Sequence, residues 1–403
     1  MKGAGLELTI GERVAFYRRR RGLTQETLAG LVNRTTSWLE KVEGGRAPLD
    51  RISVVRDLAH ALDVSLRDLL PDDIPGVLAE TRRQSVPALR DLVLSYRAVN
   101  PRFAASDASL APAGSDELRR LVADVWTAYQ NSQFGYAVMR LNQGLPVVYL
   151  AQQRPDTKIA ATRALAYLYQ AAASVLVKLG HLDLAWLCAE RGDIEARKLG
   201  DPVTLTSLQR SIAHTLLSNG QFDIAVDVVR DGLIEAADLT SPAGLSVTGT
   251  LMLVGATAAA RAGERNEATT FLRHAGLLAD RLNHDGNEVW TSFGPTNVAI
   301  HRVTVAAELG DVAEAVEIGA SLKVDGMPRE RRVRHQLEVA RALSRLGRRD
   351  NALFALLDAE CSAPEQVRRH FITHELVHGW MRSTRTRPSP DLVALARRLG
   401  HAA

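Results

Sequence analysis

The stretch ASVLVKLGHLDLAWLCAERG, residues 173–192, carries a spacing that recurs through the C-terminal three-quarters of the 403-residue chain. A glycine is followed five residues later by an alanine, and two further positions, seven residues outside this pair on each side, are mostly small. The pairs are Gly180/Ala185, Gly220/Ala225, Gly263/Ala268, Gly310/Ala315 and Gly347/Ala352. The flanking residues are Ala173, Ala213, Ala256, Val303 and Ala340 before the glycines, and Gly192, Gly232, Ala275, Leu322 and Ala359 after the alanines.

This spacing predicts a series of helical hairpins. Two helices approach closely only where their facing side chains are small, and a glycine ends the first helix in a left-handed conformation at low cost. A single hairpin of this kind cannot bury its apolar face, so it must stack on its neighbours. From residue 115 onward the pattern is helical, without convincing strand alternation, and we expect an all-α fold.

The repeated segment resembles the tetratricopeptide repeat family over residues 160–360. The repeat glycines lie 40, 43, 47 and 37 residues apart in this chain. The family period is about 34 residues, and inserted loops would account for the excess. Residues 115–154 and 364–400 are expected to form divergent or capping hairpins of the resulting α-solenoid.

A different motif lies near the N-terminus, LTQETLAGLVNRTTSWLEKVEGGR, residues 23–46. Thr24 and Thr35 are suited to cap two short helices, and Asn33 stands where the turn between them needs a positive φ. The residues expected to be buried are Leu28, Ala29, Val32, Leu39 and Val42. Those left facing outward are Thr36, Ser37, Glu40 and Lys41. A helix that enters the DNA major groove needs this division between apolar and polar sides.

Residues 10–70 resemble the XRE, or lambda-repressor-like, helix-turn-helix family. The resemblance is carried by the LTQE-x-LA start, by Glu43-x-Gly45-Arg46, by Leu58-Ala59-x-Ala61-Leu62-x-Val64 and by Leu69-Leu70. It implies that Gln25 binds a backbone phosphate, that Thr36, Ser37 and Lys41 read bases, and that Arg34 and Arg46 contact phosphates. Arg34 replaces the usual apolar turn residue, so it either repacks the turn or reaches DNA. Trp38 is also unusual, and it either packs against the domain or contacts the sugar-phosphate edge.

The charge distribution agrees with a nucleic-acid partner for this region. Residues 1–67 contain 12 Lys/Arg and 8 Asp/Glu, whereas residues 68–403 contain 38 of each. The whole excess of +4 therefore lies at the N-terminus, where a phosphate backbone is the natural partner. The run Arg18–Arg21 is expected to be either a solvated helix face or a phosphate contact, the latter adding salt-sensitive attraction.

Three segments are predicted: a helix-turn-helix DNA-binding domain over 1–72, a connecting helix (about 77–99) and linker over 73–114, and a repeat domain over 115–403. Cys188 and Cys361 are too few for a disulfide framework and fit a reducing cytosol. The first 25 residues lack the apolar core of a signal peptide, and the uncharged run 239–260 favours a buried helix over a membrane span. We therefore expect a cytoplasmic protein with no membrane partner.

The family pattern places polar residues on the concave surface of the array: Gln170, Ser174, Lys178, Arg210, His214, Thr257, Asn297, Thr304, Arg341 and Arg345. Amides pair with peptide groups and arginines bind carboxylates, so this mixture suits a peptide or a small anionic molecule. The segment 290–297 adds Trp290, and His301 shares the face of Asn297. The predicted ligand-binding residues are Gln170, Arg210, His214, Trp290, Asn297 and His301, against the alternative of a solvated helix face and a core tryptophan.

An XRE domain joined to tetratricopeptide repeats resembles peptide-sensing quorum regulators and uncharacterised actinobacterial regulators. This resemblance implies a homodimer bound to a palindromic double-stranded operator. It also implies that a signalling peptide, a small molecule or a protein partner binds the repeats and changes the spacing of the two DNA-reading helices.

Two alternatives remain open. His374, Glu375 and His378 match His-Glu-x-x-His, the pattern of a zinc peptidase. No further His or Glu follows at a suitable spacing, and the sheet that backs such a helix is absent from the pattern. The third hypothesis is an adaptor whose N-terminal domain is mainly scaffold. No phosphate loop, zinc finger or dinucleotide fingerprint is present, so we predict no cofactor, no metal site and no enzymatic activity.

Overall fold

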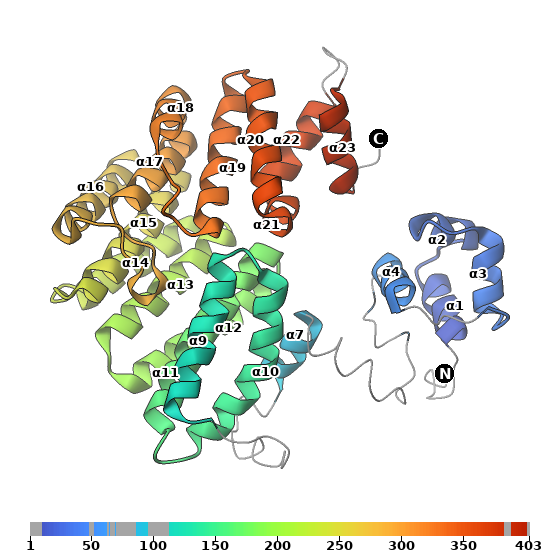
Figure 1. Ribbon diagram of the computed structural model, residues 1–403, viewed down its shortest axis with the longest axis horizontal. Helices are drawn as coiled ribbons and strands as arrows, with labels where there is room; N and C mark the ends of the chain where they lie inside the picture. Colours follow the sequence, from blue (N-terminus) through green and yellow to red (C-terminus); the bar gives the residue numbers. More distant parts are fainter. Residues whose placement is uncertain are drawn as a thin grey trace. The chain divides into compact units, whose positions relative to one another are not determined.

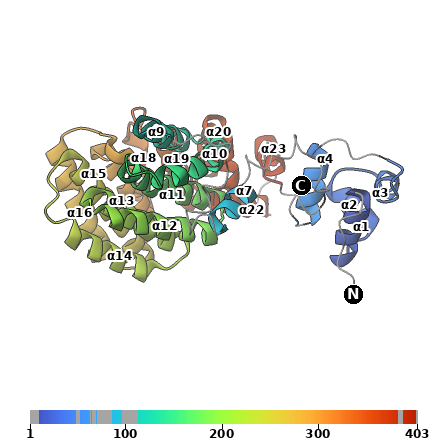
Figure 2. The same ribbon diagram turned by 90° about the horizontal axis from the view of Figure 1, so that it is seen from below.

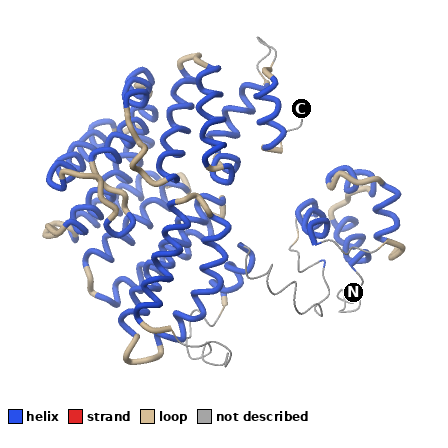
Figure 3. The backbone as a smooth tube through the Cα atoms, viewed as in Figure 1, coloured by secondary structure: helices blue, strands red, loops and turns tan. Residues whose placement is uncertain are grey.

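The structure is a computed structural model that describes residues 10–47, 52–62, 64, 69, 86–95, 113–382 and 388–400. Every element in these ranges is a helix (Figure 3), which confirms the predicted all-α fold. The chain divides into two units, Met1–Arg83 and Gln84–Ala403, and each is described by itself.

The described part of the first unit contains α1 (Ile10–Arg20), α2 (Gln25–Leu31), α3 (Thr36–Glu43) and α4 (Ile52–Leu62). The Thr24 hydroxyl accepts a hydrogen bond from the backbone N–H of Thr27, and that of Thr35 accepts one from Trp38. Asn33, between α2 and α3, has a φ of 55°. Both predicted caps and the predicted left-handed turn residue are therefore confirmed. The core of the unit includes Val14, Leu28, Ala29, Leu39, Val55, Leu58, Ala59, Leu62 and Leu69.

Gly11 allows α1 to pack directly against the end of α3. A Cβ atom at this position would lie 2.0 Å from the carbonyl oxygen of Val42, which is shorter than any van der Waals contact. Because Val42 is itself buried at the C-terminal end of α3, the close approach fixes how α3 sits on the rest of the unit. The sequence motif 23–46 therefore depends on a glycine outside it.

The second unit is built mainly of helical hairpins that follow one another around it (Figure 1). Its hairpins pair α9 (Ser115–Gln130) with α10 (Phe134–Gln152), α11 (Lys158–Leu179) with α12 (Leu182–Leu199), α13 (Pro202–Ser218) with α14 (Phe222–Glu235), α15 (Pro242–Ala262) with α16 (Arg265–Leu282), α17 (Pro295–Leu309) with α18 (Val312–Ser321), and α19 (Arg329–Arg345) with α20 (Arg349–Ser362). The turn η2 (Glu288–Trp290) lies between α16 and α17, and α21 (Pro364–Arg369), α22 (Phe371–Met381) and α23 (Pro390–Arg398) follow α20.

The repeat positions take the predicted roles. The glycines at 180, 220, 263, 310 and 347 have φ values of 80°, 77°, 85°, 90° and 76°, and the five paired alanines are fully buried. One flanking position differs from the pattern. Helix α18 ends at Ser321, so Leu322 lies beyond it in extended backbone and is only half-buried. The hairpin geometry predicted from the sequence is thus confirmed, with one shortened helix.

Helix α7 (Val86–Leu94) belongs to the second unit. Leu89 and Val93 are fully buried in the same apolar core as α9 to α12, and Arg90 forms an ion pair with Asp183 at 2.9 Å. The predicted connecting helix over 77–99 is thus described only in its middle part, and residues 77–85 and 96–99 lie outside the described residues.

In the described part of the second unit, the first helices of the hairpins form a closed ring. We call α9, α11, α13, α15, α17 and α19 the inner helices; each contacts the next, and α19 contacts α9 again (Figure 2). Two side-chain contacts join the elements beside this junction. Lys178 on α11 pairs with Glu330 on α19, and the hydroxyl of Ser132, which follows α9, donates to Gln366 Oε1 on α21 at 2.7 Å. The array therefore closes on itself within one turn.

Helix α15 is the long apolar segment predicted to be a buried helix. It is the one described helix long and apolar enough to span a membrane, and 89% of its apolar window is buried inside the unit. It contributes to the ring between α13 and α17, so its apolar character is explained by packing on both sides.

Candidate functional site

Helix α3 presents a polar face and buries its apolar one. Ser37, Glu40 and Lys41 are exposed and Thr36 is half-buried, whereas Leu39 is fully buried. Arg34 and Arg46, predicted to contact phosphates, are exposed before and after the helix. A helix of this kind can place short polar and basic side chains against base edges while it stays anchored to its domain.

Trp38 is half-buried and packs against the core of the first unit. The guanidinium carbon of Arg34 lies 5.5 Å from the centre of the Trp38 ring, in a cation–π contact. Of the two interpretations of Trp38, the structure supports packing. The same contact holds the charge of Arg34 at the surface beside the start of α3.

In the arginine run 18–21, the expectation of a solvated face or a phosphate contact is wrong for Arg18, whereas Arg19, Arg20 and Arg21 are exposed as either alternative requires. Arg18 is buried, and its Nε and Nη2 atoms donate to the two carboxylate oxygens of Glu43 at 2.6 and 2.8 Å. Its remaining nitrogen, Nη1, donates to the backbone oxygen of Leu23 at 2.9 Å. Arg18 is therefore a structural residue that joins α1 to the end of α3.

Gln25 belongs to the same cluster. Its Nε2 atom donates to Glu43 Oε2 at 2.8 Å, and the amide retains a second N–H with which a phosphate could bond. Burial raises the pKa of Glu43, but the hydrogen bonds from Arg18 and Gln25 outweigh it and lower the pKa below its usual value. We call Arg18, Gln25 and Glu43 the head cluster. Its side chains form hydrogen bonds with one another.

A second candidate site lies inside the ring of inner helices. A cavity of about 80 Å³, which we call the chamber, is lined by residues from every inner helix. The polar ones are Tyr129, Ser174, Lys178, Arg210, His214, Thr250, Thr257, Asn297, His301, Thr304, Glu330, Arg331 and Arg334. Arg210, His214, Asn297 and His301 were predicted from the sequence as ligand-binding residues, and the fold brings these four together.

The chamber is positively charged. The described residues that line it include four cations, Lys178, Arg210, Arg331 and Arg334, and one carboxylate, Glu330. Lys178 Nζ lies 2.5 Å from Glu330 Oε1, and Arg331 Nε lies 4.0 Å from Glu330 Oε2. Burial raises the pKa of Glu330, but Lys178 and the neighbouring arginines lower it to about 2, so the carboxylate stays ionised.

The two chamber histidines are neutral near pH 7. Burial, together with the charges of Arg331 and Arg334, lowers the pKa of His301 to about 3. Burial and the nearby Lys178 lower the pKa of His214 well below its usual value. His301 Nδ1 donates to the backbone oxygen of Asn297 at 2.9 Å, which leaves Nε2 as the acceptor of the neutral ring.

Three side chains of the chamber have buried polar atoms with no hydrogen-bond partner among the described residues, one of them Arg331 through its Nε. Both side-chain atoms of Asn297, which is fully buried, lack a hydrogen bond, and so does the buried Nε of Arg210. No described carboxylate pairs with Arg210, and burial lowers its pKa to about 10. An unsatisfied buried polar group costs about 1–3 kcal/mol, and a polar molecule bound in the chamber would recover part of this cost.

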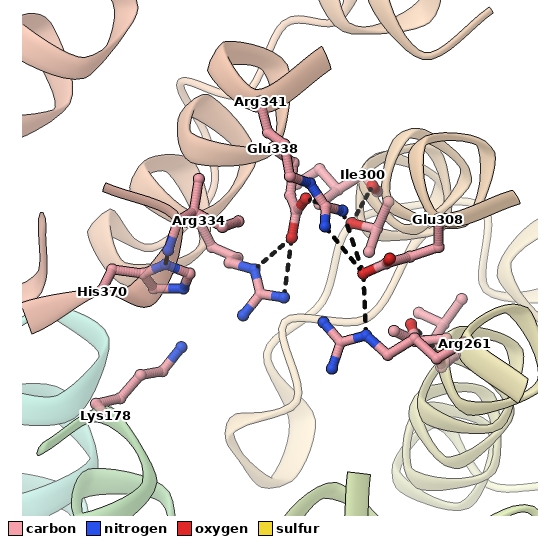
Figure 4. A network of polar contacts seen from close by, with 12 residues as sticks. Lys178, Arg261, Ile300, Glu308, Arg334, Glu338, Arg341 and His370 are labelled. Atoms are coloured by element: carbon pink, nitrogen blue, oxygen red, sulfur yellow. Dashed lines mark hydrogen bonds and ion pairs between the residues drawn. The ribbon is translucent and has the colours of Figure 1, made fainter. Parts of the chain in front are cut away.

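The remaining arginines of the region are paired (Figure 4). Arg341 donates to Glu308 at 3.2 Å and lies 2.6 Å from Glu338, and Arg261 donates to Glu308 at 2.9 Å. Arg334 donates to Glu338 at 3.1 Å, although its side chain also reaches the chamber. Arg345, which was expected on the concave surface, donates to the backbone oxygen of Ala307 at 2.8 Å. These groups hold α15, α17 and α19 together.

Gln170 and Trp290, also predicted to bind ligand, do not line the chamber. Gln170 is fully buried between helices and donates to the Ser207 hydroxyl at 2.9 Å. Trp290 stacks on Trp126 at 5.7 Å and meets the ring of Tyr167 edge-on at 5.4 Å. It therefore braces the loop before α17 against α9 and α11.

The His-Glu-x-x-His segment lies on α22. His374 Nε2 donates to the backbone oxygen of Arg368 at 2.8 Å, and His370 caps the helix by accepting from the backbone N–H of Ile372. Among the described residues there is no group of three His, Cys, Asp or Glu side chains placed to hold a metal ion. The structure therefore gives this motif no ligand set beyond its own helix.

Comparison with known proteins bears on the first unit. No curated protein matches the chain. Among solved structures, the crystal structure of Bacillus thuringiensis PlcR in complex with the peptide PapR7 and DNA is similar at 15% identity and a TM-score of 0.34, over 68% of this chain and 95% of that chain. Residues 9–71 match the family described as helix-turn-helix domain. The N-terminal part of this chain is therefore a helix-turn-helix domain.

Proposed function

We propose that the chain is a cytoplasmic transcription regulator that binds a specific duplex sequence through α3. The observation that carries the proposal is the exposed polar face of α3, with Ser37 and Lys41, on a helix-turn-helix domain whose buried polar groups are already paired within the head cluster. The local excess of positive charge supports the same conclusion. In this proposal Thr36, Ser37 and Lys41 read bases, while Gln25, Arg34 and Arg46 position the domain on phosphates.

The second unit senses a ligand in this proposal. Its chamber joins polar groups from all inner helices, so a bound molecule would contact elements that are far apart in the sequence. A ligand that favours one ring geometry over another would shift the population of that geometry. The protein acts as a homodimer on a palindromic operator, and the ligand changes the spacing of the two α3 helices.

DNA binding is tested on the full chain. Duplexes are selected from a randomised pool, and the affinity for the selected sequence is measured by fluorescence anisotropy over a range of salt concentrations. We expect Lys41→Ala to reduce discrimination between bases by roughly 5- to 150-fold, the equivalent of one bidentate base contact. Lys158→Ala, which removes an exposed lysine of the second unit, is the matched control and should change neither affinity nor discrimination. Binding without sequence preference or salt dependence would contradict the proposal.

The dimer is tested separately. Light scattering of the chain with and without duplex gives the stoichiometry, and footprinting gives the spacing of the protected half-sites. We expect two chains per duplex and half-sites about 10 base pairs apart, or a multiple of this. One chain on an asymmetric site would contradict the dimer while leaving DNA binding intact.

A further inference from the structure

The size of the chamber restricts what it can hold. A volume of about 80 Å³ corresponds to on the order of five water positions. The inner helices surround this space, and side-chain bonds such as Lys178–Glu330 close the ring. An extended peptide lying along the concave surface would not fit, whereas a compact molecule would.

The charges restrict the ligand further. Four cations and one carboxylate line the chamber, and Glu338 behind its wall pairs with Arg334, so with both histidines neutral a surplus of two positive charges remains. Lys178 and Arg334 point toward the same space between α11 and α19 (Figure 4). The guanidinium of Arg210 lies close enough to Arg331 and Glu330 for each charge to influence it. A cationic or neutral occupant would leave this repulsion uncompensated.

The unpaired groups define the remaining chemistry. Arg210 offers guanidinium donors that no described carboxylate accepts. Asn297, which lines the same chamber from α17, offers a buried amide with neither its donor nor its acceptor used. Guanidinium groups bind carboxylates and phosphates through paired N–H bonds. An amide beside them can bond to the oxyanion or to a hydroxyl on the same molecule.

We propose that the chamber is a binding site for a compact oxyanion, a small molecule bearing a carboxylate or phosphate group, held by Arg210 and Arg331 and oriented by the amide of Asn297. This inference rests on the proposed ligand-sensing function and narrows its ligand from a peptide or a small molecule to the latter. Glu330 competes with the ligand for these cations, because its carboxylate already forms an ion pair with Lys178 and lies beside Arg331.

The test measures binding to the full chain directly. Inorganic phosphate, succinate and glycerol are added at constant ionic strength, and the melting temperature of the second unit is recorded. At a concentration 100-fold above Kd, we expect the bound anion to raise the melting temperature by about 4 °C. A response to phosphate alone or to succinate alone identifies the oxyanion class, and glycerol should have no effect. If neither phosphate nor succinate raises the melting temperature at concentrations up to about 50 mM, the proposal is overturned.

Two arginine variants separate ligand binding from stability. Arg210→Met should leave the melting temperature of the free protein unchanged or higher, because it removes an unpaired buried charge. It should also weaken the binding of the effective anion by roughly 10- to 100-fold. Arg341→Met is the matched control: it breaks a paired arginine outside the chamber, so it should lower the melting temperature and keep the anion-induced shift. The reverse pattern would show that Arg210 is structural and would overturn the site.

Glu330→Gln gives an effect of the opposite sign. Removing the competing carboxylate should strengthen anion binding roughly tenfold or more. Unchanged or weaker binding would overturn the placement of the anion beside Arg331. Duplex affinity is measured in parallel, so the two proposals fail separately. Intact DNA binding without anion binding overturns only this inference, whereas anion binding that never changes duplex affinity supports the site and overturns the sensing role.

Discussion

The head cluster and the chamber each contain an arginine that is largely removed from solvent, Arg18 buried and Arg210 half-buried with a buried Nε, but the two differ in how they are paired. In the head cluster each guanidinium nitrogen of Arg18 donates a hydrogen bond, two of them to Glu43. In the chamber, the buried Nε of Arg210 has no hydrogen-bond partner among the described residues, although the Glu330 carboxylate lines the same cavity. A buried charge that is fully paired serves the fold, whereas one that stays unpaired costs stability and needs a different explanation. Under our proposal, this difference separates a structural arginine from a ligand-binding one within one chain.

The largest expected effect tests the structural side of this comparison. Arg18→Met should lower the free energy of unfolding of the first unit by about 3–5 kcal/mol, because it leaves the buried Glu43 carboxylate without its main partner. Urea unfolding followed by circular dichroism measures the loss. The exposed Arg20 provides the control, since Arg20→Met should change stability by less than about 0.5 kcal/mol. If Arg18→Met and Arg210→Met lower the unfolding free energies of their own units by the same amount, the distinction between a paired and an unpaired arginine does not hold.

The second prediction concerns the acid response of the chamber. Since the folded pKa of Glu330 is lowered to about 2, its ionised form stabilises the second unit above the unfolded pKa near 4.5. This stability, roughly 3 kcal/mol, is lost as the pH falls from about 4.5 toward 2. Unfolding free energies measured from pH 6 to pH 3 should therefore decline less steeply in Glu330→Gln than in the parent chain. An identical slope would show that Glu330 is not the responsible group.

The third prediction separates two roles of Gln25. Its bond to a charged partner, Glu43, makes Gln25→Ala destabilising by about 1.5–3 kcal/mol in urea unfolding. If its second N–H binds a phosphate, affinity for all duplexes should also fall by a common factor under conditions where the domain stays folded. Loss of stability with unchanged duplex affinity would assign Gln25 to the head cluster alone.

The smallest effect is expected at Arg34. Arg34→Ala removes a surface cation–π contact with Trp38 and should cost about 0.5–1 kcal/mol of stability. Arg34→Lys should recover part of this loss, because a lysine keeps the cation but not the flat stacking surface. Thermal unfolding of the three proteins measures the series. If Arg34→Ala does not change the stability, the contact with Trp38 does not stabilise the fold, and the Arg34 side chain is available for DNA.

The features that depend on local chemistry were predictable. The caps at Thr24 and Thr35, the left-handed Asn33 and the repeat glycines follow from backbone requirements that each residue meets on its own. The structural role of Arg18 was not predictable in this way, because its partner Glu43 lies 25 residues away in the sequence. A run of four arginines reads as one surface until the packing of α1 on α3 is known.

The chamber was predictable only in part. Arg210, His214, Asn297 and His301 lie on the inner helices α13 and α17, so the repeat register predicts the face that they share, and the curvature of the ring brings the two helices around one cavity. Tyr129, Arg331 and Arg334 were missed because α9 and α19 meet through ring closure, which no local pattern encodes. The arginine-rich start of α19, RERRVR over residues 329–334, was the available signal. Gln170 and Trp290 have side chains suited to ligand binding, but both are engaged in packing. Gln170 bonds to Ser207 at a contact between two helices, and Trp290, in the loop before α17, stacks on Trp126.

Ring closure also limits how the gene for this chain could gain or lose segments. An open solenoid can change by one hairpin, because each unit contacts only its neighbours. Here the contact of α19 with α9 fixes how many hairpins fit into the turn. Deleting or duplicating one hairpin would disturb the Lys178–Glu330 pair, and a deletion would also remove one wall of the chamber. We therefore expect length differences between related chains in the loops between helices, and not in the number of hairpins.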